Sequence, residues 1–180
     1  MWPKRMILPM FAVTLTLAGV SGGVHRASMP ASAPGCNGPE FRQFDMFAGD
    51  WDGYDVSAPE KLVARIHVTP MAGGCALREV YEQNDGLLAE SFSMYDAGRG
   101  VWHQSWVTNR GQLMMMEGHL EGDRMVLTAT DKRPGKDATL LKSTWHKAGS
   151  GVSESAVRSK DGGKTWVPEF DMIFKPHTTS

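Results

Sequence analysis

The chain has 180 residues, of which 41% are hydrophobic, 22% charged and 9% aromatic, and this composition predicts one globular domain. It excludes disordered and collagen-like proteins, which have too few hydrophobic residues or a glycine at every third position. The 19 Lys and Arg residues against 20 Asp and Glu residues leave a net charge of -1, so the chain has no basic excess with which to bind a nucleic acid.

The chain begins with a predicted signal peptide and leader, residues 1–33. Lys4 and Arg5 precede an uncharged stretch, residues 6–23, which is rich in Leu, Val, Ala and Met and is followed by small residues. A retained membrane anchor is the alternative, although this stretch is at the short limit for a span. We therefore expect an exported protein, periplasmic or secreted, whose mature domain, residues 34–180, has no stable membrane span after cleavage.

The two cysteines, Cys36 and Cys75, both follow the predicted signal peptide. An exported protein folds in an oxidising compartment, so the sequence predicts a Cys36–Cys75 disulfide. Closing a loop of about 39 residues contributes at most about 4 kcal/mol in the entropic account of disulfide stabilisation. Two buried free thiols are the alternative.

From Phe44 onward, short apolar or alternating runs recur between turn residues, without a helical period of 3.6, and this pattern predicts β-strands. The expected strands are 47–56, 61–70, 75–83, 88–95, 101–108, 112–120, 124–131, 139–147, 151–159 and 166–175. Short separators such as Asn84-Asp85-Gly86 favour antiparallel hairpins. The predicted fold is all-β, a single antiparallel barrel of about ten strands, because closure protects the sheet edges. A sandwich is the alternative, and residues 36–46 are expected to hold one short helical turn.

Alternation along a strand predicts which side chains share a face. In the expected strand 75–83, Glu79 falls between Leu77 and Tyr81 on the more apolar face. In the strand 101–108, Trp102, Gln104 and Trp106 share one side. In the strand 112–120, one face carries Leu113, Met115, Glu117 and His119, and the other carries Met114, Met116, Gly118 and Leu120. The register of the sheet decides which of these last two faces lines the interior.

Five sequence motifs follow one another along the chain. They are PEFRQFDMFAGDWDGY (39–54), GCALREVY (74–81), SFSMYD (91–96), VWHQSWV (101–107) and SKDGGKTW (159–166). Together they resemble a family of exported bacterial proteins without a settled function, whose members look like lipocalin-like (calycin) barrels. The resemblance implies a bacterial protein with this fold, adds support for the disulfide, and gives Trp51 the role of closing one end of the barrel. The last motif also fits an Asp-box hairpin, in which Asp161 sets the turn and Trp166 packs beneath it.

The leading functional hypothesis is an exported module that binds a small, mainly apolar or amphipathic ligand inside the barrel. Two tryptophans with one amide between them are typical of an apolar pocket that contains a single orienting polar group. The candidate ligand-binding residues are Trp102, Gln104, Trp106, Tyr81, Glu79 and Trp145. Aromatic side chains that simply fill the core are the alternative.

Two other classes of function are open. A desolvated Glu79 would have a raised pKa and could transfer protons in a small-molecule hydrolase or isomerase, with Glu117 or His103 as its partner. An ion pair of Glu79 with Arg65 or Arg158 is the structural alternative. The third class is a non-catalytic, envelope-associated structural protein with a filled barrel. The sequence favours a binding module over an enzyme.

No metal and no cofactor are expected. His103, His119 and His146 would have to converge from three strands, or Met114–Met116 would have to act with His119, and no local ligand spacing supports either site. No Cys-x-x-Cys-His motif for haem attachment is present. The expected partner is a small apolar ligand and not a nucleic acid, while the ligand's identity and the oligomeric state are left open.

Overall fold

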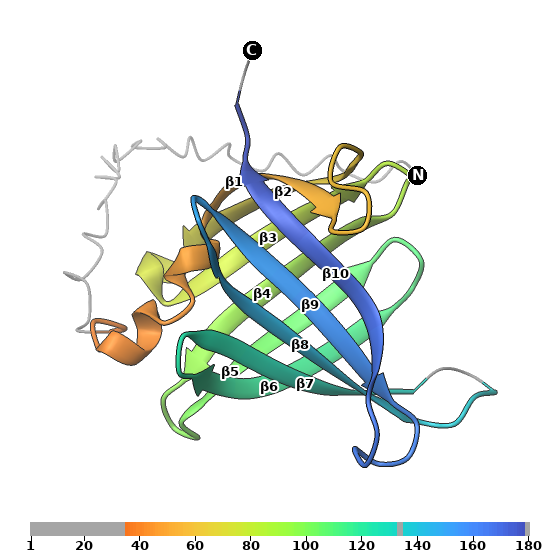
Figure 1. Ribbon diagram of the computed structural model, residues 1–180. Helices are drawn as coiled ribbons and strands as arrows, with labels where there is room; N and C mark the ends of the chain where they lie inside the picture. Colours follow the sequence, from red (N-terminus) through yellow and green to blue (C-terminus); the bar gives the residue numbers. More distant parts are fainter. Residues whose placement is uncertain (1–34, 133–134, 179–180) are drawn as a thin grey trace, which may run out of the picture. The chain divides into compact units, whose positions relative to one another are not determined.

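The protein is described by a computed structural model over residues 35–132 and 135–178. These residues form a closed antiparallel barrel with the strand order β1-β10-β9-β8-β7-β6-β5-β4-β3-β2, as Figure 1 shows. The prediction of a single antiparallel barrel of about ten strands is confirmed. The predicted signal peptide and leader, residues 1–33, lie outside the described residues. None of the helices in the described part of the chain is long and apolar enough to cross a membrane.

Every strand lies close to its predicted position. The strands are β1 (Gly49–Asp55), β2 (Leu62–Met71), β3 (Ala76–Gln83), β4 (Leu88–Asp96), β5 (Val101–Thr108), β6 (Leu113–Glu121), β7 (Arg124–Asp131), β8 (Thr139–Ala148), β9 (Gly151–Ser159) and β10 (Val167–Pro176). Three short 3-10 helices accompany them: η1 (Pro39–Arg42), η2 (Asp45–Phe47) and η3 (Ala72–Gly74).

The barrel closes through β1, which pairs with β10 on one edge and with β2 on the other. Trp51 is opposite Pro176 in the first pairing and opposite Ile66 in the second. Because each strand therefore has a hydrogen-bonded neighbour on both edges, the sheet presents no open edge to other chains. The sandwich alternative is excluded.

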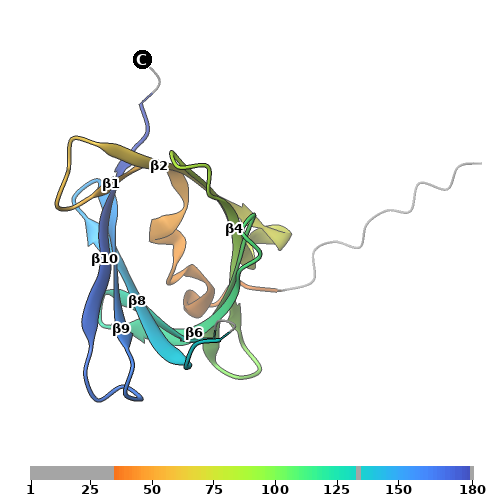
Figure 2. The same cartoon turned by 90° about the vertical axis from the view of Figure 1, so that its right-hand side faces the viewer.

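The segment that contains η1 and η2 closes one end of the barrel. Figure 2, which looks along the barrel, shows this orange segment across the far opening of the ring of strands. Phe44 and Phe47 are completely buried there and pack against Trp102 and Trp145. Aromatic contacts of this kind stabilise the folded protein by more than their buried area alone predicts. The expected helical turn in residues 36–46 is thus present in 3-10 form and acts as a plug.

Three links hold the plug in place. Cys36 and Cys75 form the predicted disulfide, with their Cα atoms 5.1 Å apart, and so tie the plug to the start of β3. The Trp51 Nε1–H donates a hydrogen bond of 2.9 Å to the carbonyl oxygen of Phe47. Trp102 Nε1 donates to Gln43 Oε1 at 3.0 Å. One end of the interior is therefore filled, and any open space must lie toward the other end.

The hairpin between β9 and β10 is fixed by Asp161, as the Asp-box pattern predicts. Its carboxylate accepts hydrogen bonds from the backbone N–H groups of Lys164 at 3.0 Å and Thr165 at 2.9 Å. These bonds and those from the Thr165 and Ser159 hydroxyls lower the pKa of Asp161 to about 2. Trp166 Nε1 donates to the carbonyl oxygen of Gly163 at 3.1 Å.

Candidate functional site

The inward faces of the strands carry both apolar and polar side chains. From β3, β4 and β5, the inward residues include Leu77, Glu79, Tyr81, Ala89, Ser91, Ser93, Trp102, Gln104 and Trp106. The pairing of β5 with β6 places Met114 opposite Trp106 and Met116 opposite Gln104. The face of β6 that carries Met114 and Met116 therefore lines the interior, and Met115 and Glu117 point outward.

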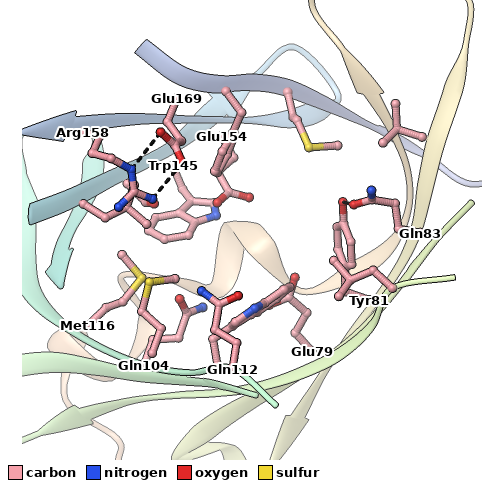
Figure 3. A pocket seen from close by; sticks show the side chains of 18 of the residues that line it. Glu79, Tyr81, Gln83, Gln104, Gln112, Met116, Trp145, Glu154, Arg158 and Glu169 are labelled. Atoms are coloured by element: carbon pink, nitrogen blue, oxygen red, sulfur yellow. Dashed lines mark hydrogen bonds and ion pairs between the residues drawn. The ribbon is translucent and has the colours of Figure 1, made fainter. Parts of the chain in front are cut away.

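A cavity of about 360 Å³ lies between the plug and the open end of the barrel. Its apolar walls include Tyr81, Leu87, Trp106, Met114, Met116, Leu141, Trp145, Phe170 and Met172, and its polar lining consists of Asp55, Glu79, Gln83, Gln104, Gln112, Ser143, Glu154, Arg158 and Glu169. This volume lies within the usual range of small-molecule sites, as does the combination of aromatic walls with a few polar groups. Figure 3 shows the labelled polar groups around this space.

Glu79 is the most deeply placed carboxyl group of the cavity. Its side chain is 4% exposed, and the Ser91 hydroxyl donates a hydrogen bond of 2.6 Å to Oε2. Gln104 Nε2 in turn donates to the hydroxyl oxygens of Ser91 at 3.3 Å and Ser93 at 3.1 Å. Burial raises the pKa of Glu79 to about 7, and the hydrogen bond from Ser91 opposes this rise. Glu79 is therefore partly protonated near neutral pH.

A second carboxyl group, Glu154, enters the same cavity from β9. It is opposite Trp145 of β8 and Met172 of β10, and part of its surface remains accessible through the cavity. Burial raises its pKa to about 8, with a further contribution from the charge of Glu79. The interior thus contains two coupled acidic groups that are both largely protonated below neutral pH.

The indole nitrogen of Trp145 lies beside the carboxyl group of Glu154 (Figure 3). Its proximity opposes the rise in the pKa of Glu154. The contact nevertheless lacks the geometry of a hydrogen bond, so Trp145 Nε1 is a buried donor without an acceptor among the described residues. Such a donor is uncommon, because a buried N–H without a partner is energetically costly.

Tyr81 and Trp106 form an aromatic wall beside Glu79. Their rings meet edge to face, with centroids 5.4 Å apart, and the Tyr81 hydroxyl donates to Gln83 Oε1 at 3.0 Å. Burial and the nearby carboxyl groups of Glu154 and Glu79 raise the pKa of Tyr81. The phenol therefore remains neutral and contributes a polar edge to an apolar wall.

Arg158 lies at the mouth of the cavity and is neutralised by two carboxylates. Its Nε and Nη2 donate to both carboxylate oxygens of Glu169 at 2.9 and 2.8 Å, and its Nη1 donates to Asp131 Oδ2 at 2.9 Å. Nη1 also donates to the Thr139 hydroxyl at 2.7 Å. These carboxylates hold the pKa of Arg158 above its ordinary value. The guanidinium belongs to this ion-pair network and does not pair with Glu79.

The structure brings together five of the six residues predicted to contact a ligand. Glu79, Tyr81, Gln104, Trp106 and Trp145 line the cavity. The sixth, Trp102, shares the inward face of β5 but lies in the plug region, where it packs against Phe44 and Tyr95.

The two predicted catalytic partners of Glu79 lie on the outer surface. His103 and Glu117 are cross-strand neighbours whose Nδ1 and Oε1 atoms are 3.1 Å apart, and Arg99 donates to the same Glu117 oxygen at 2.8 Å. The backbone alternation of β5 and β6 points these side chains away from the cavity. The structure therefore does not bring His103 or Glu117 to Glu79.

The histidines considered for a metal site do not form one. In residues 35–132 and 135–178, no group of three or more His, Cys, Asp and Glu side chains could hold an ion. His146 instead contacts Arg124, with His146 Nδ1 at 3.1 Å from Nη1, and His119 is exposed.

The chain matches no protein-family model, and a search of curated proteins finds no significant match. The closed barrel and the disulfide that the resemblance implied are both present. Function is therefore inferred from the residues of the cavity.

The principal group that sequence reasoning missed is Glu154. A signal was present in the sequence. Val152, Glu154 and Ala156 occupy every second position and therefore share one face of the expected strand 151–159. Small serines at positions 153 and 155 made the two faces of this strand look alike. The contrast between the faces was thus too weak to reveal a carboxyl group on the inner one.

Proposed function

We propose that the protein is an exported module that binds a small, mainly apolar molecule inside its barrel. The observation that carries this proposal is the cavity of about 360 Å³ with Tyr81, Trp106 and Trp145 on its walls. A barrel built only for rigidity would fill this space with side chains, because protein interiors are normally close-packed. The polar groups between the aromatic walls would orient the bound molecule.

Binding can be tested with N-phenyl-1-naphthylamine, an uncharged fluorescent probe whose emission rises in apolar surroundings. We expect a saturable rise in fluorescence with the full-length mature protein. Ser143 points into the cavity and Thr144, the next residue on β8, points outward. Ser143→Phe should reduce probe binding at least tenfold, whereas the matched variant Thr144→Phe should leave it unchanged. Absence of saturable binding, or equal binding by the two variants, would refute an internal site.

Export is the second part of the proposal and is supported by the disulfide. A disulfide persists in an oxidising compartment and is rare in reducing ones. Alkylation of protein recovered from the periplasm or the medium should label Cys36 and Cys75 only after reduction. Equal labelling without reductant, or recovery of the protein from the cytoplasm alone, would contradict export.

A partner-binding role has one observation in its favour. The outer faces of β4, β5 and β6 expose a group of large apolar side chains: Leu88, Phe92, Met94, Val107, Leu113 and Met115. Exposed apolar clusters of this kind are typical of contact surfaces. A solid barrel would have favoured this role as the main function, and the cavity favours a small ligand instead.

A further inference from the structure

The ionisable groups that line the cavity are mostly acidic. Among the described residues that line it, the carboxyl groups are Asp55, Glu79, Glu154 and Glu169, and the single basic side chain is Arg158. Arg158 is already neutralised by Glu169 and by Asp131, which lies behind it. Glu79 and Glu154 have no basic partner among these residues. The deep part of the cavity therefore provides acidic groups for which the protein itself supplies no cation.

The walls suit a cation with an apolar body. Tyr81, Trp106 and Trp145 line the same cavity as the two carboxyl groups. The faces of aromatic rings attract ammonium groups, most strongly where water is excluded. An uncharged apolar molecule would use the walls but would leave Glu79 and Glu154 protonated, whereas a cation would pair with their ionised forms.

Trp145 supplies an independent observation. Its buried Nε1–H has no acceptor among the described residues, although the carboxyl group of Glu154 lies beside it. A carboxylate accepts hydrogen bonds more strongly than a carboxylic acid does. Ionisation of Glu154 by a bound cation would therefore strengthen the attraction between its carboxylate and this N–H group.

We propose that the cavity selects a small organic cation, a protonated amine on an aromatic or aliphatic body, which is held between Glu79 and Glu154. This inference rests on the proposed function, because it requires that the cavity accept a ligand. The ammonium group would lie against the two carboxylates, and the body would pack against Tyr81, Trp106 and Trp145.

Proton release provides a distinctive signature for this proposal. A cation that binds between Glu79 and Glu154 favours their ionised forms, so protons leave the carboxyl groups as the ligand enters. The other titratable groups that face the cavity are Asp55, Tyr81, Arg158 and Glu169. Tyr81 has a raised pKa and stays neutral, Asp55 has a lowered pKa and stays ionised, and Arg158 stays paired with Glu169. The released protons therefore come from Glu79 and Glu154, and affinity for the cation rises from about pH 6 to about pH 8.

The experiment compares tryptamine with tryptophol, which has the same indole body but a hydroxyl group in place of the ammonium. Isothermal titration at about pH 8 should show tryptamine binding at least tenfold more tightly than tryptophol, and this ratio should shrink at about pH 6. Titration in two buffers of different ionisation enthalpy should show proton release with tryptamine only. N-phenyl-1-naphthylamine is titrated in parallel to report whether the cavity accepts an apolar molecule at all.

Variants assign the effect to the two carboxyl groups. Glu154→Gln and Glu79→Gln should each lower the affinity for tryptamine at least fivefold and leave binding of N-phenyl-1-naphthylamine within about twofold of the wild type. Glu90→Gln, on the outer face of β4 where Glu90 pairs with Arg78, is the matched control and should change neither. Retained probe binding also shows that each variant is folded.

The possible outcomes separate the two proposals. If N-phenyl-1-naphthylamine binds and tryptamine binds no better than tryptophol, or not at all, cation selection is wrong and the binding module stands. A tryptamine preference that survives both Gln variants also overturns the inference. If none of the three compounds binds inside the barrel, the proposed function itself fails.

Discussion

Glu79 on β3 and Glu154 on β9 project from opposite sides of the barrel into one cavity (Figure 3), and the charge of Glu79 raises the pKa of Glu154. Two acidic groups in such a position destabilise a folded protein once both lose their protons. The barrel tolerates them near neutral pH because the raised pKa values keep both groups at least partly protonated. The same two groups give the protein a predictable dependence on pH.

Stability should fall as the pH rises through the range in which these groups titrate. The pKa rises from an ordinary value of 4.5 to about 7 for Glu79 and to about 8 for Glu154, so the folded state retains protons that the unfolded chain has released. The stabilisation is therefore complete below about pH 4.5 and is lost as the pH passes through about 7 and 8. Glu154→Gln removes the part of this loss that Glu154 causes. Its free energy of unfolding at about pH 8.5 should exceed that of the wild type by about 2 to 4 kcal/mol.

The measurement is chemical denaturation of both proteins at about pH 5 and about pH 8.5, without reductant. At the lower pH, the difference should be below about 1 kcal/mol, because the amide replaces a carboxyl group that is already neutral. Glu90→Gln should shift neither value by more than about 0.5 kcal/mol, since Glu90 is exposed. A Glu154→Gln variant that is equally or less stable at the higher pH would contradict the raised pKa.

The positions of the strands were predictable because alternation of apolar and polar residues and the presence of turn residues are both local signals. Leu62, Ala64, Ile66 and Val68 alternate with polar residues along β2, and turn residues separate the strands. The inward position of Glu79 followed from the same alternation.

Depth along the barrel axis and pairing across strands were not predictable. Trp102 and Trp106 share the inward face of β5, yet one packs against the plug and the other lines the cavity. Alternation distinguishes inside from outside but does not fix the distance from either end. Glu117 was open as a partner of Glu79 because the register of β6, which decides its inward face, was unknown. His103, by contrast, lies between Trp102 and Gln104 in the sequence, and alternation alone puts it on the other face of β5.

The ion pair between Arg158 and Asp131 should contribute measurably to stability. Their side chains are 12% and 8% exposed, and removal of either partner leaves a poorly solvated charge behind. We expect Arg158→Met to lower the free energy of unfolding by about 2 to 4 kcal/mol. A double-mutant cycle with Asp131→Asn should give a coupling energy above about 1 kcal/mol.

The control cycle uses Arg110 and Asp85, whose side chains are 52% and 51% exposed. Its coupling energy should be below about 0.5 kcal/mol, because solvent screens an exposed pair. Equal coupling energies in the two cycles would show that burial does not strengthen the ion pair between Arg158 and Asp131.

Loss of the disulfide should loosen the plug more than the barrel. Cys36→Ser with Cys75→Ser removes the covalent link and should lower the free energy of unfolding by at most about 4 kcal/mol. Native-state hydrogen exchange should show a larger loss of protection for the backbone N–H groups of Phe47 and Ala48, which bond to Phe44 and Asp45, than for β9. An equal loss in both regions would mean that the plug does not open separately.

Gly118 should be irreplaceable although it lies inside a strand, where glycine is ordinarily unfavourable. It is opposite Trp102 of β5 and Leu127 of β7, and a Cβ added to it would lie 1.9 Å from the carbonyl oxygen of Val126. Because that atom belongs to the backbone, Gly118→Ala must force β6 and β7 apart and should lower the free energy of unfolding by about 2 kcal/mol or more. Gly98→Ala is the control, since its Cβ would meet only a side-chain oxygen of Asp96 at 3.3 Å, and it should change stability by less than about 1 kcal/mol. Thermal and chemical denaturation of both variants measure the difference, and a Gly118→Ala protein as stable as the wild type would disprove the close approach of the two strands.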